Sequence, residues 1–353
     1  MKIGILTHHY VKNYGAFLQM KSLYEVIRQI YPQAEISIVN YVKYKHWQKN
    51  ILHVLHYRKS IDSLHTYASK VKQLLVFTKY ERSLPRTRKV YSASGIAKLG
   101  LDMLILGSDE IWNIQGSGYH PLKFGCGVEK LNVIAYAPSV GAVTEETVVP
   151  DEIKGGLSSI RFVSGRDEES IKFVKRAVGR EAVKMPDPTF LYNFDKDIKA
   201  EGIRPKPYKY ILLYDCKLTD ELVVLLCGYA KKHGYRILGA GDYKAFYDEV
   251  TINLTPYEWV DLFRNAGKVI TGTFHGTVFS VKYDRDFICY PTEKNRINKI
   301  SSLLADIKLS ERLMKIGEEE KFDSLIDEIP DYAYAHEYLT CKKREAIDFL
   351  HIK

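Results

Sequence analysis

The chain has 353 residues, 46% of them hydrophobic and 27% charged, which excludes a disordered protein and makes two domains the default. Its five cysteines are scattered and form no CxxC pair, so they indicate neither a zinc site nor a disulfide framework. The first residues lack a signal-peptide pattern and no run approaches the roughly 18 apolar residues of a membrane span, so we expect a cytoplasmic protein.

The net charge of +9 is concentrated in one segment, residues 42–90, which we call the basic insertion. It carries 12 Lys or Arg and 2 Asp or Glu, so the rest of the chain is nearly neutral. Apolar residues such as Trp47, Leu55 and Phe77 lie among these charges at helical spacing. This pattern suits peripheral contact with an anionic membrane surface, although a helical insertion with a solvated basic face is the commoner explanation. No nucleic-acid-binding module is present, so we expect no nucleic-acid partner.

Strand and helix patterns alternate through the first half of the chain. KIGILT predicts a strand, residues 13–29 predict a helix, and AEISIVNY predicts a second strand. Beyond the basic insertion, which we expect to be helical, four strand-like runs end in small or polar residues: LDMLILGSD, VIAYAPSVG, IRFVSGRD and AVKMPDPTFL. This is typical of a parallel sheet with its loops at one ligand-binding edge. We assign residues 1–195 to an N-terminal Rossmann-like domain that contains the insertion.

A second α/β pattern follows a polar, proline-containing stretch at residues 193–209, which we interpret as a linker. Strands are predicted at YILLYDC, YRILGAG, KVITG and FICYP, with helices between and after them. We assign residues 205–320 to a C-terminal Rossmann-like domain and 330–353 to a C-terminal helix. The predicted fold class is α/β, with two doubly wound domains facing a cleft.

The loop after the first strand, HHYVKNYGAFLQ, supplies the first candidate ligand-binding residues: His9, Asn13, Tyr14 and Gly15. Gly15 allows close approach of the backbone, and the amides at a helix N-terminus favour an anion. Asn13 could instead simply cap the helix. Neither GxGxxG nor a P-loop is present, so a dinucleotide site is not supported.

The run LILGSDEIWN places Ser108 and Asp109 just after a buried strand. Asp109 could orient or deprotonate a hydroxyl group, or it could serve only as a turn residue. Trp112 could offer an apolar platform for a sugar ring, or it could pack in the core.

Arg166 follows another predicted strand, in SGRDEES, where a guanidinium could bind phosphate or carboxylate in a bidentate manner. The neighbouring Asp167, Glu168 and Glu169 could instead neutralise it as a surface network. Asp187, between two prolines, predicts a rigid structural turn.

His275 lies in ITGTFHGTVFS, between a predicted strand end and a helix start, where open α/β sheets place ligands. Lys294, Arg296 and Lys299 follow the next strand. An imidazole beside these cations could hold an anionic substrate and move a proton. The alternative is a histidine that only satisfies a turn.

Six blocks in this order, HHYVKNYGAFLQ, LGSDEIWN, IAYAPSVG, SGRDEES, PDPTFL and ITGTFHGTVFS, resemble the polysaccharide pyruvyl transferase family from the first strand to about Leu304. The resemblance implies a GT-B-like fold. It also implies transfer of pyruvate from phosphoenolpyruvate to hydroxyls of a sugar in a cell-surface polysaccharide, exopolysaccharide or capsule, or its lipid-linked precursor. The product would be a pyruvate ketal, and neither a metal nor an organic cofactor would be required.

The resemblance also implies roles for the candidate residues. His275 would be the general acid/base and Arg166 a second catalytic residue that grips the donor. Donor binding would fall to Lys294, Arg296, Gly276 and Thr277, in the C-terminal domain. Acceptor binding would fall to His9, Asn13, Tyr14, Gly15, Ser108, Asp109 and Trp112.

The chain departs from the family at Thr273, where better-studied members carry an arginine two residues before the histidine. Two alternatives therefore stay open: a GT-B-type glycosyltransferase that uses a nucleotide sugar, and a non-catalytic glycan-binding relative. The basic insertion would suit an enzyme placed peripherally at the inner face of the plasma membrane, near lipid-linked glycans.

Overall fold

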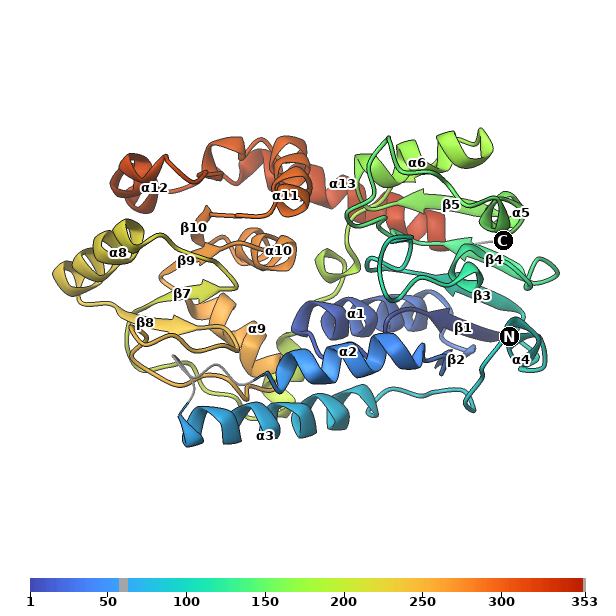
Figure 1. Cartoon of the computed structure of the whole chain (residues 1–353), viewed down its shortest axis with the longest axis horizontal. Helices are drawn as coiled ribbons and strands as arrows, with labels where there is room; N and C mark the ends of the chain where they lie inside the picture. The colour runs from blue at the N-terminus through green and yellow to red at the C-terminus, as the bar shows by residue number, and fades with distance from the viewer. Residues whose placement is uncertain (57–62, 352–353) are drawn as a thin grey trace. The chain divides into compact units, whose positions relative to one another are not determined.

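The structure is a computed structural model that describes residues 1–56 and 63–351 (Figure 1). The chain divides into two compact units. Unit 1 comprises Met1–His53, Thr78–Tyr192 and Thr340–Lys353, and unit 2 comprises Val54–Phe77 and Asn193–Leu339. Each unit is therefore assembled from separate stretches of the sequence.

Unit 1 contains a six-stranded parallel sheet in the order β2-β1-β3-β4-β5-β6. The central strands are buried apolar runs, as expected for a sheet covered on both faces. The strands are β1 Lys2–Leu6, β2 Glu35–Ile38, β3 Met103–Leu106, β4 Asn132–Ala135, β5 Phe162–Gly165 and β6 Val183–Lys184. The connecting helices are α1 Tyr14–Ile30, α4 Ala93–Ala97, η1 Pro121–Phe124, α5 Asp151–Ser159, α6 Glu168–Val178 and η2 Pro188–Phe190.

Unit 2 contains a four-stranded parallel sheet in the order β10-β9-β7-β8. Its strands are β7 Tyr210–Tyr214, β8 Arg236–Gly239, β9 Lys268–Thr271 and β10 Asp286–Cys289. Its helices are α7 Asp195–Ala200, α8 Asp220–His233, α9 Pro256–Asn265, α10 Phe274–Lys282, α11 Lys294–Asp306, η3 Ser310–Arg312, η4 Glu319–Lys321 and α12 Phe322–Asp327. The predicted linker thus contains a helix, α7, which contacts α9.

The final helix, α13 (Ala333–Leu350), begins in unit 2 and ends in unit 1. Near its end, Phe349 contacts the rings of Tyr136 and Phe162, and the Leu350 carbonyl accepts a hydrogen bond from the Tyr31 hydroxyl. Both ends of the described chain therefore lie in unit 1 (Figure 1).

The basic insertion forms α2 (Tyr44–Val54) and α3 (Leu64–Glu81), while its residues 57–62 lie outside the described part of the chain. The α3 helix buries polar Thr66, Ser69 and Gln73. The Gln73 amide donates hydrogen bonds to the carbonyls of Gly241 and Ile252. Its apolar residues Leu64, Val71 and Leu75 are exposed instead.

Both sheets are doubly wound, and each has a point where the strand order changes direction: between β1 and β3 in unit 1, and between β7 and β9 in unit 2. Open α/β sheets bind their ligands beyond the carboxyl ends of the strands at such points. The two loop clusters described next lie there.

Candidate functional site

In unit 2, His275 lies in the first turn of α10, which begins directly after β9. The helix starts there because Thr273 is its N-cap and accepts a 3.0 Å hydrogen bond from the Gly276 N–H. Gly276 packs so closely on the strand that a Cβ there would lie 1.9 Å from Thr271 Oγ1. The His275 side chain is half-buried. The sequence therefore fixes the position of this imidazole locally, through a capping residue and a glycine.

The residue that departs from the family pattern, Thr273, thus has a structural role in this chain. Besides capping α10, it accepts a 2.9 Å hydrogen bond at its carbonyl from the Thr277 hydroxyl. Thr277 is fully buried, and its hydroxyl also lies 3.1 Å from Cys289 Sγ. The N–H groups of both predicted donor-binding residues, Gly276 and Thr277, thus donate to Thr273 within the helix, and the Thr277 hydroxyl is engaged there as well.

The basic residues after β10 lie beside the strand that precedes His275, because β9 and β10 pair in parallel. Arg296 contacts Asp215, which follows β7, at 2.8 Å and Glu293 at 3.2 Å. Although burial opposes it, the carboxylates of Asp215 and Glu293 raise the pKa of Arg296. Lys294 is exposed at the start of α11, whereas Lys299 is buried. Arg296 thus joins the loops after β7 and β10 at one edge of the sheet, on either side of β9.

In unit 1, the predicted acceptor-binding residues after β1 are mostly buried. His9 is 2% exposed, and burial, together with the Arg86 charge, lowers its pKa to about 3. Tyr14 and Gly15 are buried in the first turn of α1. Asn13 is exposed and caps α1 by accepting a 3.1 Å hydrogen bond from the Ala16 N–H, which is the capping alternative that the sequence left open.

Two of the three candidates near β3 turn inward. Ser108 is fully buried, and its hydroxyl donates to the Ala137 carbonyl at 2.7 Å. Trp112 is also fully buried, stacks on Phe124 and donates its indole N–H to the Lys123 carbonyl. This burial corrects the expectation of a sugar platform, because Trp112 offers no face to a ligand. Asp109 stays half-buried with a positive φ of 73°, so it is the candidate of this loop that a ligand can meet.

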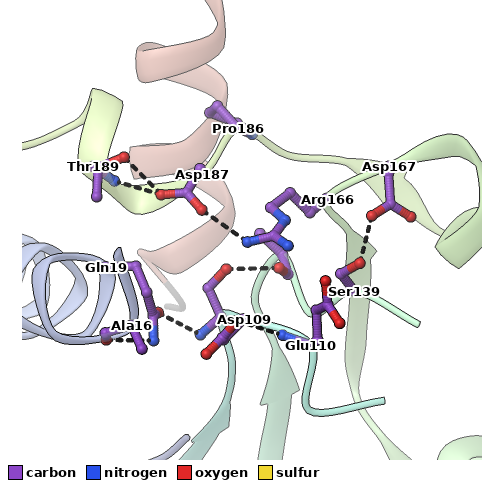
Figure 2. A network of polar contacts seen from close by, with 12 residues as sticks. Ala16, Gln19, Asp109, Glu110, Ser139, Arg166, Asp167, Pro186, Asp187 and Thr189 are labelled. Carbon is purple, nitrogen blue, oxygen red and sulfur yellow. Dashed lines mark hydrogen bonds and ion pairs between the residues drawn. The ribbon is translucent and has the colours of Figure 1, made fainter. Parts of the chain in front are cut away.

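Arg166 lies in a buried ion pair, which differs from the predicted grip on a donor and from the alternative of a surface network. Its Nη1 is 3.0 Å from Asp187 Oδ2, and their side chains are 3% and 0% exposed. Figure 2 shows Asp187 between Arg166 and Thr189, whose N–H and hydroxyl both donate to Asp187 Oδ1. Asp167 instead accepts from the Ser139 hydroxyl. Although burial opposes it, Asp187 and Asp109 raise the pKa of the guanidinium, so Arg166 stays charged.

The structure also brings together basic residues that the sequence analysis missed: His8 after β1, His46 in α2 and Lys123 in η1. Lys123 Nζ contacts His8 Nε2 and donates a 2.7 Å hydrogen bond to the Gly118 carbonyl. The rings of His8 and His46 lie 4.9 Å apart. The contacts join positions up to 115 residues apart, so no local spacing could have indicated them. We call these three residues the His–Lys cluster.

Burial keeps the His–Lys cluster from carrying its ordinary charge. Burial, followed by the nearby Lys123, lowers the pKa of His8 well below its usual range and that of His46 to about 4. Burial and the charge of Lys43 lower the pKa of Lys123 to about 7, while Asp109 acts in the opposite direction. Binding of an anion would therefore raise the pKa of these bases and favour their protonation.

Within the described residues, no three or more His, Cys, Asp or Glu side chains gather so as to hold a metal ion. None of the helices there is both long enough and apolar enough to cross a membrane.

Solved structures of the same architecture define the fold class. The UDP-GlcNAc 2-epimerase from Neisseria meningitidis bound to UDP-GlcNAc matches with a TM-score of 0.52 at 8% identity, over 100% of this chain and 95% of that chain. UGT89C1 of Arabidopsis thaliana complexed with UDP-L-rhamnose matches with a TM-score of 0.53 at 10% identity, over 99% of both chains. These identities establish a shared fold and no more. The protein has the GT-B-like fold of two Rossmann-like domains, as predicted.

The family follows from the sequence. The family model described as polysaccharide pyruvyl transferase matches residues 13–294, which is most of the chain. The chain belongs to the polysaccharide pyruvyl transferase family, and the predicted resemblance is confirmed. A search of curated proteins finds no match.

Proposed function

We propose that this protein transfers pyruvate from phosphoenolpyruvate to two hydroxyls of one sugar in a cell-surface polysaccharide or its lipid-linked precursor, forming a pyruvate ketal. The observation that carries the proposal is the placement of His275. In a chain of this family, a half-buried imidazole lies at the N-terminal end of a helix, next to the strand whose loop supplies Lys294 and Arg296.

The reaction needs one proton donor and one proton acceptor. A proton adds to the methylene carbon of phosphoenolpyruvate, and C2 becomes electrophilic. A sugar hydroxyl then forms a C–O bond to C2 and loses its proton. The C2–O bond to phosphate breaks, and a second hydroxyl closes the ketal while its proton leaves with the phosphate. Each proton gained is matched by one lost, so a single imidazole can serve in both directions.

We assign the proton transfers to His275 and the binding of the donor to the residues around it. The N-terminal end of α10, where His275 lies, favours an anion. Lys294 is exposed and can move towards a phosphate, whereas Arg296 must share its charge with Asp215 and Glu293. Asp109 is the acceptor-binding candidate that we retain. Arg166 is better suited to hold the loops after β5 and β6 in place, because its guanidinium is buried against Asp187.

The test is the substitution His275→Gln, which keeps a hydrogen-bonding side chain of similar size. We expect release of phosphate from phosphoenolpyruvate, measured with a panel of vicinal-diol sugars, to fall at least about 100-fold. Binding of phosphoenolpyruvate, measured by isothermal titration calorimetry, should persist. His336→Gln is the matched control in unit 2, because His336 is exposed and pairs with Asp284.

The same calorimetry separates the alternatives. Binding of UDP or GDP without binding of phosphoenolpyruvate would overturn pyruvyl transfer in favour of a nucleotide-sugar transferase. Glycan binding with no turnover by the unmodified protein would favour a non-catalytic relative.

We further propose that the enzyme works at an anionic membrane surface, where a lipid-linked acceptor would be presented. The support is the exposed face of α3, which combines Leu64, Val71 and Leu75 with Lys72 and Lys79. Apolar residues flanked by lysines match the chemistry of an anionic bilayer surface. Cosedimentation with phosphatidylglycerol vesicles at low salt is the measurement, and a protein that stays wholly unbound would overturn the proposal.

A further inference from the structure

The His–Lys cluster has no part in the chemistry proposed for unit 2, yet it lies where an open α/β sheet binds ligands, beyond the neighbouring strands β1 and β3. His8 comes from the loop after β1, and Asp109 follows β3. His46 lies in α2, between β2 and β3, and Lys123 lies in η1, between β3 and β4. Four separate segments therefore converge at this point.

Basic groups outnumber acidic groups around the cluster. Lys43 and Lys49 face it as charged groups, while burial lowers the pKa of the neighbouring His9 and His120. On the acidic side, Asp109 Oδ2 lies 4.0 Å from His8 Nδ1. Glu152 accepts from the Tyr119 hydroxyl at the edge. A lysine at the centre makes the position repulsive to a metal cation and attractive to an anion.

The donors are held in place before any ligand arrives. Lys123 is fixed by the Gly118 carbonyl, and the Tyr10 hydroxyl bonds to His46 Nδ1 at 3.1 Å, so Nε2 is the ring atom with which His46 would meet a ligand. Gly118 packs directly on the rings, because a Cβ there would lie 2.9 Å from both His46 Nδ1 and His8 Nε2. Positions fixed in this way favour binding, since little side-chain freedom remains to be lost.

We propose that His8, His46 and Lys123 form a binding site for an oxyanion of the acceptor, either the phosphate of a lipid-linked precursor or the carboxylate of an acidic sugar. This inference rests on the proposed function in that it takes the ligand to be the glycan acceptor. It assigns a substrate class to a site that the pyruvyl-transfer chemistry does not require.

Binding at this site has a distinctive signature. Near neutral pH His8 and His46 are uncharged and Lys123 is only partly charged, and a bound anion favours the protonated form of each. Binding should therefore take up protons from the buffer. Calorimetry in two buffers of different ionisation enthalpy measures this uptake directly, because the observed enthalpy then differs between the buffers.

The experiment uses the full chain with inorganic pyrophosphate and with glucuronate as probes at neutral pH. We expect one of them to bind with proton uptake. His46→Gln and Lys123→Met should weaken that binding at least 10-fold and reduce the uptake. His53→Gln, on the exposed side of the same helix, and Lys130→Met, at an exposed position, are the matched controls. His46 is only half-buried, so this variant keeps the test valid if Lys123→Met does not fold.

Each outcome decides a question. Pyrophosphate binding that needs His46 supports a phosphate-bearing acceptor, and glucuronate binding that needs His46 supports an acidic sugar. Failure of both probes, or binding that both variants leave unchanged, overturns the proposal. Loss of phosphoenolpyruvate binding in His46→Gln would overturn the assignment to the acceptor and place the donor here. A protein that binds pyrophosphate but not phosphoenolpyruvate would retain this site while the proposed function fails.

Discussion

Arg166 carries a positive charge into the interior of unit 1, and Asp187 is the group that makes this burial possible. Asp187 is held by Pro186 and Pro188 on either side and by two hydrogen bonds from Thr189. The sequence predicted the rigid turn correctly, because two prolines restrict the backbone locally. It could not reveal the partner, since the pair spans 21 residues and depends on the packing of β5 beside β6.

The buried pair predicts a large and strongly non-additive effect on stability. Arg166→Met or Asp187→Asn alone should lower the free energy of unfolding by about 3–5 kcal/mol, because each leaves a buried polar group without its partner. The double variant should lose less than the sum of the two. Urea unfolding of the four proteins measures the coupling.

The control for this cycle is an exposed pair, Lys175 and Glu181, whose side chains are 65% and 74% exposed. Lys175→Ala should change the free energy of unfolding by less than about 1 kcal/mol. Additive losses in the Arg166 and Asp187 variants would contradict the view that each depends on the other.

At the scale of elements, apolar runs and turn residues were sufficient to locate the strands and most helices. Long periodic patterns, such as that of α8 with Thr219 as its cap, were unambiguous. The predicted strand-like run AVKMPDPTFL contains β6, although only Val183 and Lys184 form the strand. An element that the patterns missed is α7, which lies in the polar stretch interpreted as a linker and contacts α9. Tertiary contacts decided this element, whereas local preference decided the others.

The α3 helix predicts which residues mediate binding to a bilayer. Leu64→Ser combined with Leu75→Ser should reduce cosedimentation with anionic vesicles several-fold, because these side chains are 89% and 68% exposed and would otherwise enter the lipid. Stability should change little, since the substituted side chains make few internal contacts.

The matched control for α3 is Val224→Ser in α8, which removes an exposed apolar residue elsewhere in unit 2. Lys72→Gln with Lys79→Gln should weaken binding at low salt and abolish its salt dependence. Equal vesicle binding by the leucine variant and the unmodified protein would assign the contact to a different surface.

At the scale of the whole molecule, buried bases make stability depend on pH. The pKa of His9 is about 3 and that of His8 is well below its usual value, so the folded state does not take up protons that the unfolded state binds below pH 6.5. Stability is therefore present at neutral pH and lost on acidification. Neighbouring Lys206 and Tyr208 lower the pKa of Glu249 despite its burial, so protonation of this carboxylate also reduces stability as the pH falls. Burial raises the pKa of Glu81, so this group has the opposite effect on stability.

We expect the free energy of unfolding to fall from neutral pH towards pH 4, by up to about 1.4 kcal/mol per pH unit for each buried neutral histidine. Chemical denaturation across this range measures the slope. His9→Gln should flatten it by one such contribution, whereas His53→Gln, at an exposed position, should leave it unchanged. A slope that His9→Gln does not alter would mean that this histidine is already protonated in the folded protein.

The division of the chain into units has a consequence for synthesis. Unit 1 uses residues 340–353, where Phe349 packs on Tyr136 and Phe162, but all of unit 2 precedes that stretch. During synthesis, residues 193–339 of unit 2 are therefore translated before residues 340–353 of unit 1. The contacts that the end of α13 makes with Tyr136 and Phe162 can form only after that second unit has left the ribosome.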